Sequence, residues 1–256
     1  MVTFETKVWE KDWEYILKGN YLNNIISVNN FRFAKKQIII NNVKNRNLVE
    51  KFCEKKVKEG VIDCYFSVED FEAEVLKHFD LKHDSFKGGY YYSIAELLGI
   101  YKCQTKYLLH YSGDSYLKKT GQNWINDAIE VMEQNANIWV ANPSWKDTLD
   151  EAKNESFDEI EKFYLGYGFS DQCYLVRTED FSQKIYNDKN PISERYPKYG
   201  GELFEKRVDA FMRNNEKIRI THKFTSYVHK NFRSDWISRK IIRNQLVEKR
   251  LIKMKT

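Results

Sequence analysis

An apolar run that ends at a single acid is the feature of this sequence best suited to chemistry. The run YLLHY ends at Tyr111 and is followed by Ser112, Gly113 and Asp114. It predicts a buried strand, and open α/β sheets bind ligands at the carboxyl ends of such strands. Ser112 and Gly113 predict a tight turn with close backbone approach, which a simple helix cap does not need. We therefore predict that Asp114 faces a binding cleft.

Two further acids lie beside apolar, strand-like runs. Asp70 follows the run VIDCYFSV, and Asp171 lies between the glycines of GYG and the run QCYLVR. Strand ends gather along one edge of a parallel sheet, so these acids and Asp114 could converge on one cleft. Aspartate is also a preferred helix N-cap, and this simpler interpretation stays open for Asp70 and Asp171.

Strands and helices alternate along the chain in the order needed to position these acids. We expect strands at 21–29, 61–68, 107–111, 136–140 and 172–177, and helices at 34–58, 71–79, 92–102, 124–134 and 201–214. The segment 146–163 is polar and loop-like. This alternation predicts an α/β fold with a mostly parallel, Rossmann-like central sheet and flanking helices.

The composition indicates one ordered domain. Aromatic residues are abundant (17 Tyr, 16 Phe and 6 Trp), whereas 3 Pro and 11 Gly leave little material for linkers. The four cysteines form no CxxC pair, which favours reduced thiols. We expect no signal peptide and no membrane span, since no apolar run approaches the ~20 residues a span requires. The expected location is cytoplasmic, with peripheral membrane contact as an option.

The positive charge is concentrated at the carboxyl end. Residues 233–256 carry eight Lys or Arg against two acids, so residues 1–232 sum to −1 within a total of +5. A near-neutral body with a basic tail argues against nucleic-acid binding. We expect a domain at 1–232 and a basic amphipathic helix at 233–256. This helix either lies on an anionic membrane surface or packs on its own domain.

The stretch from Ala95 to Asp114 resembles the helix-strand segment of GT-A-fold, family-2-like glycosyltransferases. Ala95, Gly99 and Asp114 fall in the register of the family pattern, which has Ala and Gly four apart and then Asp-x-Asp after a strand. The resemblance covers roughly residues 21–230 and implies a GT-A-like fold that binds a nucleotide-sugar, most simply a UDP-sugar. It implies nucleotide-sugar contacts at the following residues: Val28, Asn29, Asn30, Arg32, Asp70, Ser93, Ser112, Gly113 and Asp114.

The sequence departs from the family pattern at the metal site. Ser112 replaces the first acid of Asp-x-Asp. A divalent ion that bridges a diphosphate is held by few protein oxygens, so the resemblance implies Mn²⁺ or Mg²⁺ on Asp114 and a late histidine, His222 or His229. An ordinary surface or core position is the alternative for each histidine. Without metal, Arg32 or Lys87 would have to neutralise the diphosphate.

The resemblance also implies a base and an acceptor side. Asp171 corresponds to the acid that deprotonates the acceptor hydroxyl in an inverting displacement. For acceptor binding we predict Trp145, Tyr199, Gly200 and Glu205. The apolar faces of sugar rings stack on aromatic side chains, and the polar groups around the ring hydrogen-bond to carboxylates. A buried structural Trp145 is the simpler alternative.

These patterns lead to one functional hypothesis and two rivals. The hypothesis is a glycosyltransferase that moves a sugar from a nucleotide-sugar to a glycan or lipid-linked acceptor, as in cell-surface polysaccharide synthesis. One rival is a nucleotidyltransferase, which predicts a Gly-rich phosphate loop after the first strand; Asn29, Asn30 and Phe31 supply none. The other is a carbohydrate- or partner-binding module without catalysis.

Overall fold

A computed structural model describes residues 1–119, 123–146, 149–197 and 200–229, so the predicted helix at 233–256 lies outside it. The strands are β1 Val2–Val8, β2 Lys35–Ile40, β3 Cys64–Ser67, β4 Tyr107–Tyr111, β5 Ser115–Lys119, β6 Ile138–Trp145, β7 Ser156–Ile160, β8 Phe163–Gly166, β9 Cys173–Arg177 and β10 Ile218–His229. The α-helices are α1 Trp13–Lys18, α2 Tyr21–Ser27, α3 Arg46–Lys58, α4 Val68–His78, α5 Ile94–Lys102, α6 Trp124–Gln134, α7 Leu149–Asn154, α8 Thr178–Phe181 and α9 Phe204–Asn214. Short 3₁₀ helices are η1 His83–Phe86, η2 Tyr90–Tyr92 and η3 Pro191–Arg195.

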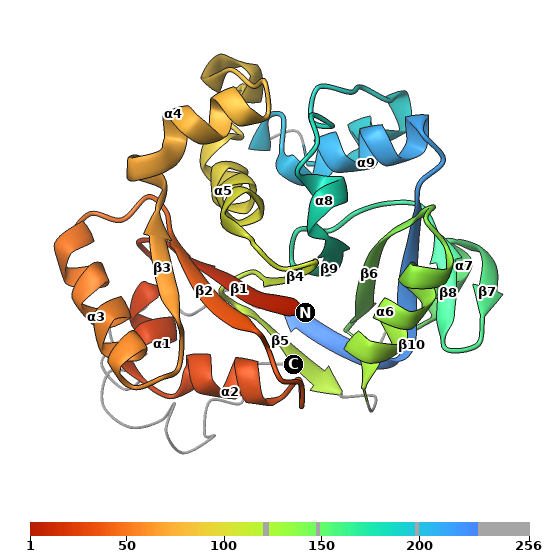
Figure 1. Cartoon of the computed structure of the whole chain (residues 1–256). Coiled ribbons are helices and arrows are strands. Elements are labelled where there is room, and N and C mark those ends of the chain that lie inside the picture. The colour runs from red at the N-terminus through yellow and green to blue at the C-terminus, as the bar shows by residue number, and fades with distance from the viewer. Residues whose placement is uncertain (120–122, 147–148, 198–199, 230–256) are drawn as a thin grey trace.

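The described strands join into one mixed sheet through the centre of the molecule. Its order is β3-β2-β1-β4-β9-β6-β10-β8-β7, with β5 paired to β10 (Figure 1). Strands β3, β2, β1 and β4 are mutually parallel, and β6 is parallel to β10. Because β9 is antiparallel to both β4 and β6, these two groups run in the same direction. The carboxyl ends of β1, β4 and β10 therefore share an edge with the amino end of β9.

Each face of the sheet is covered by its own set of helices. One apolar core joins the sheet to α1, α2, α3 and α6, and a second joins it to α4, α5, α8 and α9. The alternation of side chains along β2 shows the division, because Ile38 and Ile40 pack in the first core and Ile39 packs in the second. The result is a three-layer α/β/α arrangement, and the predicted α/β fold with a largely parallel central sheet is confirmed.

The first strand was predicted in the wrong place. The segment from Tyr21 to Ser27 is helix α2, whose Leu22 and Ile25 are buried three positions apart, a helical spacing. The true first strand is β1, VTFETKV, which alternates apolar and polar residues. Its polar residue Glu5 contacts His110 inside the fold, and Lys7 forms an ion pair with Glu96. A charged strand at the centre of a sheet hides its own signal, since central strands are usually apolar.

The predicted helix at 34–58 is also partly wrong. Its first part, KKQIII, is strand β2, and only Arg46–Lys58 is helical. Asn42 between them has a φ of 50°, a left-handed conformation that asparagine tolerates. Asn45 then caps α3 by accepting a hydrogen bond from the Leu48 N–H at 3.1 Å.

Several other predicted elements are confirmed, with shifts at their ends. The helix at 124–134 and the strand at 107–111 match α6 and β4, and the strand at 172–177 matches β9. The predicted strands at 61–68 and 136–140 are β3 and β6, and the helices at 71–79, 92–102 and 201–214 are α4, α5 and α9. The expected loop at 146–163 is wrong, because it contains α7 and β7. No helix in the described part of the chain is long and apolar enough to cross a membrane.

Candidate functional site

The site forms where the parallel strands end. The N–H of Ser112, just past β4, donates to the Gln172 carbonyl just before β9 at 2.9 Å. This bond brings the Asp114 turn next to the segment that carries Asp171. On the other side, β10 ends at His229, which pairs with Ser115 in β5. Three segments distant in the sequence therefore meet at one sheet edge.

Asp114 and His229 are in direct contact. The Nε2 of His229 lies 2.9 Å from Oδ1 of Asp114, and their side chains are 29% and 16% exposed. Burial lowers the pKa of His229, but the hydrogen bond and negative charge of Asp114, with the charge of Asp171, raise it above its ordinary value. Carboxylate charge therefore favours the protonated form of His229, and a metal ion would have to displace this proton to bind the ring nitrogen.

The turn before Asp114 is tightly packed. A side chain at Gly113 would begin 2.7 Å from the Asp12 carboxylate and 2.9 Å from the Lys7 carbonyl, so only glycine fits. The Ser112 hydroxyl lies 2.6 Å from the Ser115 hydroxyl and 3.5 Å from Asp114 Oδ1. Ser112 thus orients the turn, while Asp12 adds a second carboxylate close to it.

Asp12 is a buried carboxyl group. Burial raises the pKa of Asp12 well above its usual range, and the charge of Asp114 adds to the rise. Its Oδ1 accepts a hydrogen bond from the Trp9 N–H at 2.8 Å. The segment after β1 therefore contributes an acid to the site, and the misplacement of the first strand caused the sequence analysis to miss it.

The second candidate histidine lies elsewhere. His222 is 1% exposed, and its Nε2 is 3.6 Å from Asp127 on α6. Its ring packs edge-on against Phe163 at 5.1 Å between centroids. Burial lowers the pKa of His222. Of the two predicted metal ligands, the structure brings His229 to Asp114 and does not bring His222.

The nucleotide contacts predicted after the first strand are not at a strand end. Val28 ends α2, and Asn29 is buried, with its amide donating to the Ile25 carbonyl at 2.7 Å and its Oδ1 accepting from the Tyr111 hydroxyl at 2.8 Å. Asn30 has a φ of 46°, and Arg32 is exposed before β2. These residues close a helix because α2 occupies the predicted strand, so the strand-end basis for their role was wrong.

Asp70 and Ser93 also make intramolecular contacts. Asp70 lies in the first turn of α4, not at the end of β3, and its Oδ1 receives Nη1 of Arg46 at 2.7 Å. The Ser93 hydroxyl is fully buried, donates to the Gly89 carbonyl and accepts from the Phe204 N–H at 2.9 Å. It therefore joins α5 to α9. Lys87, a candidate cation, is paired with Glu202 at 3.5 Å.

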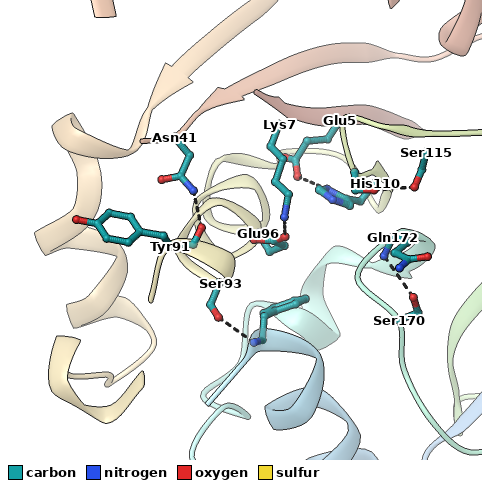
Figure 2. A network of polar contacts seen from close by, with 12 residues as sticks. Glu5, Lys7, Asn41, Tyr91, Ser93, Glu96, His110, Ser115, Ser170 and Gln172 are labelled. Carbon is teal, nitrogen blue, oxygen red and sulfur yellow. Dashed lines mark hydrogen bonds and ion pairs between the residues drawn. The ribbon is translucent and has the colours of Figure 1, made fainter. Parts of the chain in front are cut away.

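A buried polar network lies on the α5 face of the sheet, beneath the site (Figure 2). Glu5 contacts His110 at 2.9 Å and accepts from Gln37 at 2.6 Å. Burial raises the pKa of Glu5 to about 8 and lowers that of His110 well below its ordinary value. Glu5 and His110 therefore form a neutral pair near pH 7, because both lie in the same fully buried environment.

Lys7 and Glu96 form an ion pair that reaches from this network towards the site (Figure 2). Burial lowers the pKa of Lys7, but the charges of Glu96, Asp171 and Asp12 outweigh burial and raise it. Lys7 is therefore a stable cation among carboxylates. Lys7 was not among the predicted site residues, although the alternation of VTFETKV was a usable signal for a strand with Lys7 near its end.

Asp171 and Glu205 are the two acids on the other side of the site. Burial raises the pKa of Glu205 to about 8, and the charge of Asp171 adds to the rise, although a hydrogen bond from the Asp171 backbone opposes it. Glu205 is thus mostly protonated near pH 7. The pair can supply both a carboxylate that accepts a proton and a carboxyl group that donates a hydrogen bond.

A cavity of about 270 Å³ opens beside these acids. The residues that line it are Asn142, Trp145, Glu151, Ala152, Glu155, Phe169, Ser170, Gln172, Tyr196, Glu205, Arg219, Thr221 and Tyr227. Tyr227 and Gln172, joined at 3.2 Å, connect the cavity to the strand ends at Asp114 and His229. The structure therefore brings together Trp145 and Glu205. The Gly200 carbonyl packs against Gly89 instead, and Tyr199 lies outside the described residues.

In the described residues, no group of three or more His, Cys, Asp or Glu side chains is arranged to hold a metal ion. Asp114 and His229 are two protein donors of suitable type, since carboxylate oxygen suits Mn²⁺ and Mg²⁺ and imidazole nitrogen suits transition metals. The pair fits a divalent ion that takes its other ligands from phosphate and water.

Comparisons with known proteins identify the fold. No family model and no curated protein sequence matches the chain. A crystal structure of GalNAc-T7 with UDP, GalNAc and Mn²⁺ matches 90% of this chain at 12% identity and a TM-score of 0.50; the chain spans only 43% of that protein. UDP-glucose pyrophosphorylase complexed with UDP-glucose matches 97% of this chain and 100% of its own at 11% identity and a TM-score of 0.52. The chain thus has the GT-A-type fold that the sequence resemblance implied.

Proposed function

We propose that this protein is a glycosyltransferase that uses a divalent metal and a nucleotide-sugar, most simply a UDP-sugar, and transfers the sugar with inversion. The observation that carries the proposal is the contact of Asp114 with His229 beside a cavity lined by Trp145 and Glu205. On one side of this sheet edge, Asp114 and His229 supply ligand atoms for a metal ion that can also bind a diphosphate. The other side has an aromatic ring and carboxyl groups suited to a sugar.

Each side of the edge has a defined task in such a transfer. Asp114 and His229 would hold Mn²⁺ or Mg²⁺, which neutralises negative charge on the departing diphosphate. Lys7, held as a cation by its carboxylate neighbours, adds positive charge nearby. Asp171 is the proposed base that takes the proton of the acceptor hydroxyl. Glu205, mostly protonated, donates a hydrogen bond on the acceptor side.

The GT-A-type fold also occurs in UDP-glucose pyrophosphorylase, so nucleotidyl transfer is the second candidate. A Gly-rich phosphate loop after the first strand would distinguish a nucleotidyltransferase from a glycosyltransferase. Now that β1 is placed at Val2–Val8, the segment after it is Trp9 to Asp12, WEKD, which contains no glycine. This segment is followed directly by α1. The local sequence therefore favours sugar transfer over nucleotidyl transfer.

A panel of nucleotide-sugars and nucleoside triphosphates separates these candidates. We expect a UDP-sugar to raise the thermal stability only with Mn²⁺ or Mg²⁺, because ligand stabilisation grows with ln(1 + [L]/Kd). Slow hydrolysis of the bound UDP-sugar, measured as release of UDP, should accompany binding. Pyrophosphate formation from UTP and a sugar 1-phosphate, without UDP release, would establish nucleotidyl transfer instead. Binding of sugars alone, with neither reaction, would establish a binding module.

A further inference from the structure

The size and lining of the cavity restrict what can enter it. Its volume of about 270 Å³ is slightly below the usual range of roughly 300–1,000 Å³ for small-molecule sites. A single ring fits this space better than an extended chain. Trp145 and Tyr227 supply aromatic surface, and Asn142 and Gln172 supply amide groups. Aromatic faces with a few polar groups suit the apolar faces and hydroxyl rim of one sugar ring.

The charge of the lining is negative. This charge comes from Glu151 and Glu155, which lie towards solvent, whereas the more buried Glu205 is mostly protonated and contributes little of it. Arg219 is the one cation among the described lining residues, and its guanidinium already pairs with Glu155 at 3.4 Å. Lys146 lies with its Nζ 4.2 Å from the Trp145 ring centre but does not line the cavity.

The Glu155 carboxylate also faces a second guanidinium. Arg195 lies 4.0 Å from Glu155 and 3.9 Å from the buried Asp209. Gly168 makes this crowding feasible, because a side chain there would begin 2.7 Å from Arg195 and 3.2 Å from Arg219. Both arginines near the cavity thus face the Glu155 carboxylate, with which an anionic ligand would have to compete, although Nε of Arg219 has no hydrogen-bond partner among the described residues.

We infer that the cavity is an acceptor subsite for one sugar ring without an anionic group, so that the nucleophile is a sugar hydroxyl and not a phosphate oxygen. This inference rests on the proposed function, because only a transferase has an acceptor. It restricts the class of acceptor to sugars without an anionic group. A neutral hydroxyl needs a base, which Asp171 supplies, whereas a phosphate is already anionic and would meet Asp171, Glu151 and Glu155 as like charges. Exclusion of such ligands is specificity by repulsion.

Direct binding to the full chain tests the inference without any reaction. The probes are the methyl glycoside of a neutral hexose, the same hexose 6-phosphate and the corresponding hexuronate, followed by saturation-transfer NMR and titration. We expect the neutral glycoside to bind at least roughly tenfold more tightly than either anion, a factor that corresponds to about 1.4 kcal/mol. Trp145→Ala should weaken the neutral probe.

A matched pair of variants reports on charge. Glu155→Gln leaves Arg219 without its carboxylate partner, so the hexose 6-phosphate should bind more tightly. The preference for the neutral glycoside over this phosphate should therefore fall by roughly threefold or more. Glu155→Asp keeps the charge and should keep the preference. Equal or tighter binding of an anionic probe to the wild type would overturn the inference, and so would the failure of every probe to bind.

The result is separable from that of the proposed function. Nucleotide-sugar binding is measured by thermal stabilisation with Mn²⁺, which under the proposed function depends on Asp114 and His229 and not on the cavity. If the donor binds and the anionic probe is preferred, only the acceptor inference fails. If the donor does not bind and the neutral probe is preferred, the transferase proposal fails, and the cavity stands as a subsite for an uncharged sugar.

Discussion

The carboxylate of Glu5 occupies the space in which a side chain at Gly99 would begin. The carboxylate cannot easily move away, because it contacts His110 and Gln37 in a fully buried setting. The glycine that supports the family resemblance at the sequence level therefore has a structural cause: it lets α5 pack directly on a charged central strand.

Gly99→Ala should destabilise the fold. A methyl group there would displace Glu5 or move α5, and overpacking of this kind costs about 1–3 kcal/mol. Chemical denaturation measures the free energy of unfolding. Gly99→Ala combined with Glu5→Gln does not relieve the clash, whereas the combination with Glu5→Ala should recover part of the loss. A neutral or stabilising effect of the single change would contradict the packing described.

The pH dependence of stability should report on Glu5. Its pKa is raised to about 8 in the folded state, so the folded protein holds a proton that the unfolded chain releases near pH 4.5. Stability attributable to Glu5 therefore falls as pH rises from 4.5 to 8. His110, with a lowered pKa, acts in the opposite direction below pH 6.5. The two effects oppose each other at low pH, and a net loss remains between pH 6.5 and 8.

Glu5→Gln should flatten the curve in that window. One proton corresponds to a slope of at most about 1.4 kcal/mol per pH unit. Glu205, whose pKa is also about 8, contributes in the same direction and remains in this variant. Its own substitution, Glu205→Gln, is thus the matched comparison. Denaturation series at pH 6.5, 7.25 and 8 on the three proteins check the prediction, and an unchanged slope in Glu5→Gln would show that Glu5 is ionised throughout.

The sequence was sufficient to predict the fold class and several elements, but not the central strand. YLLHY and QCYLVR are made up mainly of apolar and aromatic residues, so the local sequence pattern predicts their burial. VTFETKV is different, because its charged residues Glu5 and Lys7 depend on partners on α5, β2 and β4 that are distant in the sequence. Conversely, Leu22 and Ile25 were assigned to a strand because their helical spacing was overlooked. The alternation of VTFETKV is a local signal for a strand, but the central position of β1 depends on its pairing with distant segments, which no sequence window contains.

The site was predictable to a similar extent. Asp114 was identified from its position after an apolar strand, and the need for a histidine followed from the serine at position 112. Which histidine serves was left open, since His222 and His229 have similar sequence contexts. The register of β10 against β5 and β8 determines which histidine lies beside Asp114, because it places His229 opposite Ser115 and His222 opposite Phe163. That register depends on three other strands.

Removal of either member of the Asp114–His229 pair should abolish the effect of metal. In Asp114→Asn and His229→Ala, we expect the stabilisation by a UDP-sugar with Mn²⁺ to fall to the value without metal. Saturating ligand at 100 times Kd gives about 2.7 kcal/mol, so the loss is measurable. His222→Ala is the control: it removes a buried ring and should lower stability, yet keep the response to Mn²⁺. Retention of that response in His229→Ala would exclude His229 as a ligand.

Asp70 should matter for stability and not for donor binding. Its carboxylate is held by Arg46 at the surface, with side chains 45% and 29% exposed. Such exposed pairs contribute at most about 1 kcal/mol. Asp70→Asn should therefore cost no more than this, with unchanged affinity for the nucleotide-sugar. A double-mutant cycle with Arg46→Met measures the pair, and a tenfold loss of donor affinity would return Asp70 to the binding site.

Asp171 should be required for the chemical step. A positioned base contributes typically 10²–10⁴-fold to the rate, so Asp171→Asn should lower kcat by about that factor. Because Asp171 is not expected to touch the nucleotide, the stabilisation by UDP-sugar and Mn²⁺ should persist. Asn is close to Asp in shape, and the hydrogen bond that Glu205 receives comes from the backbone, so the local structure should be kept.

Glu205→Gln is the comparison that identifies the base. A protonated Glu205 acts as a hydrogen-bond donor, a role that the glutamine amide can fill, so this variant should lose much less activity than Asp171→Asn. Transfer rates over pH 6 to 9 with the acceptor of the highest rate provide the measurement. If Glu205→Gln is inactive and Asp171→Asn is active, then Glu205 is the base, and the raised pKa of Glu205 near 8 should appear as the rising limb of the wild-type pH profile.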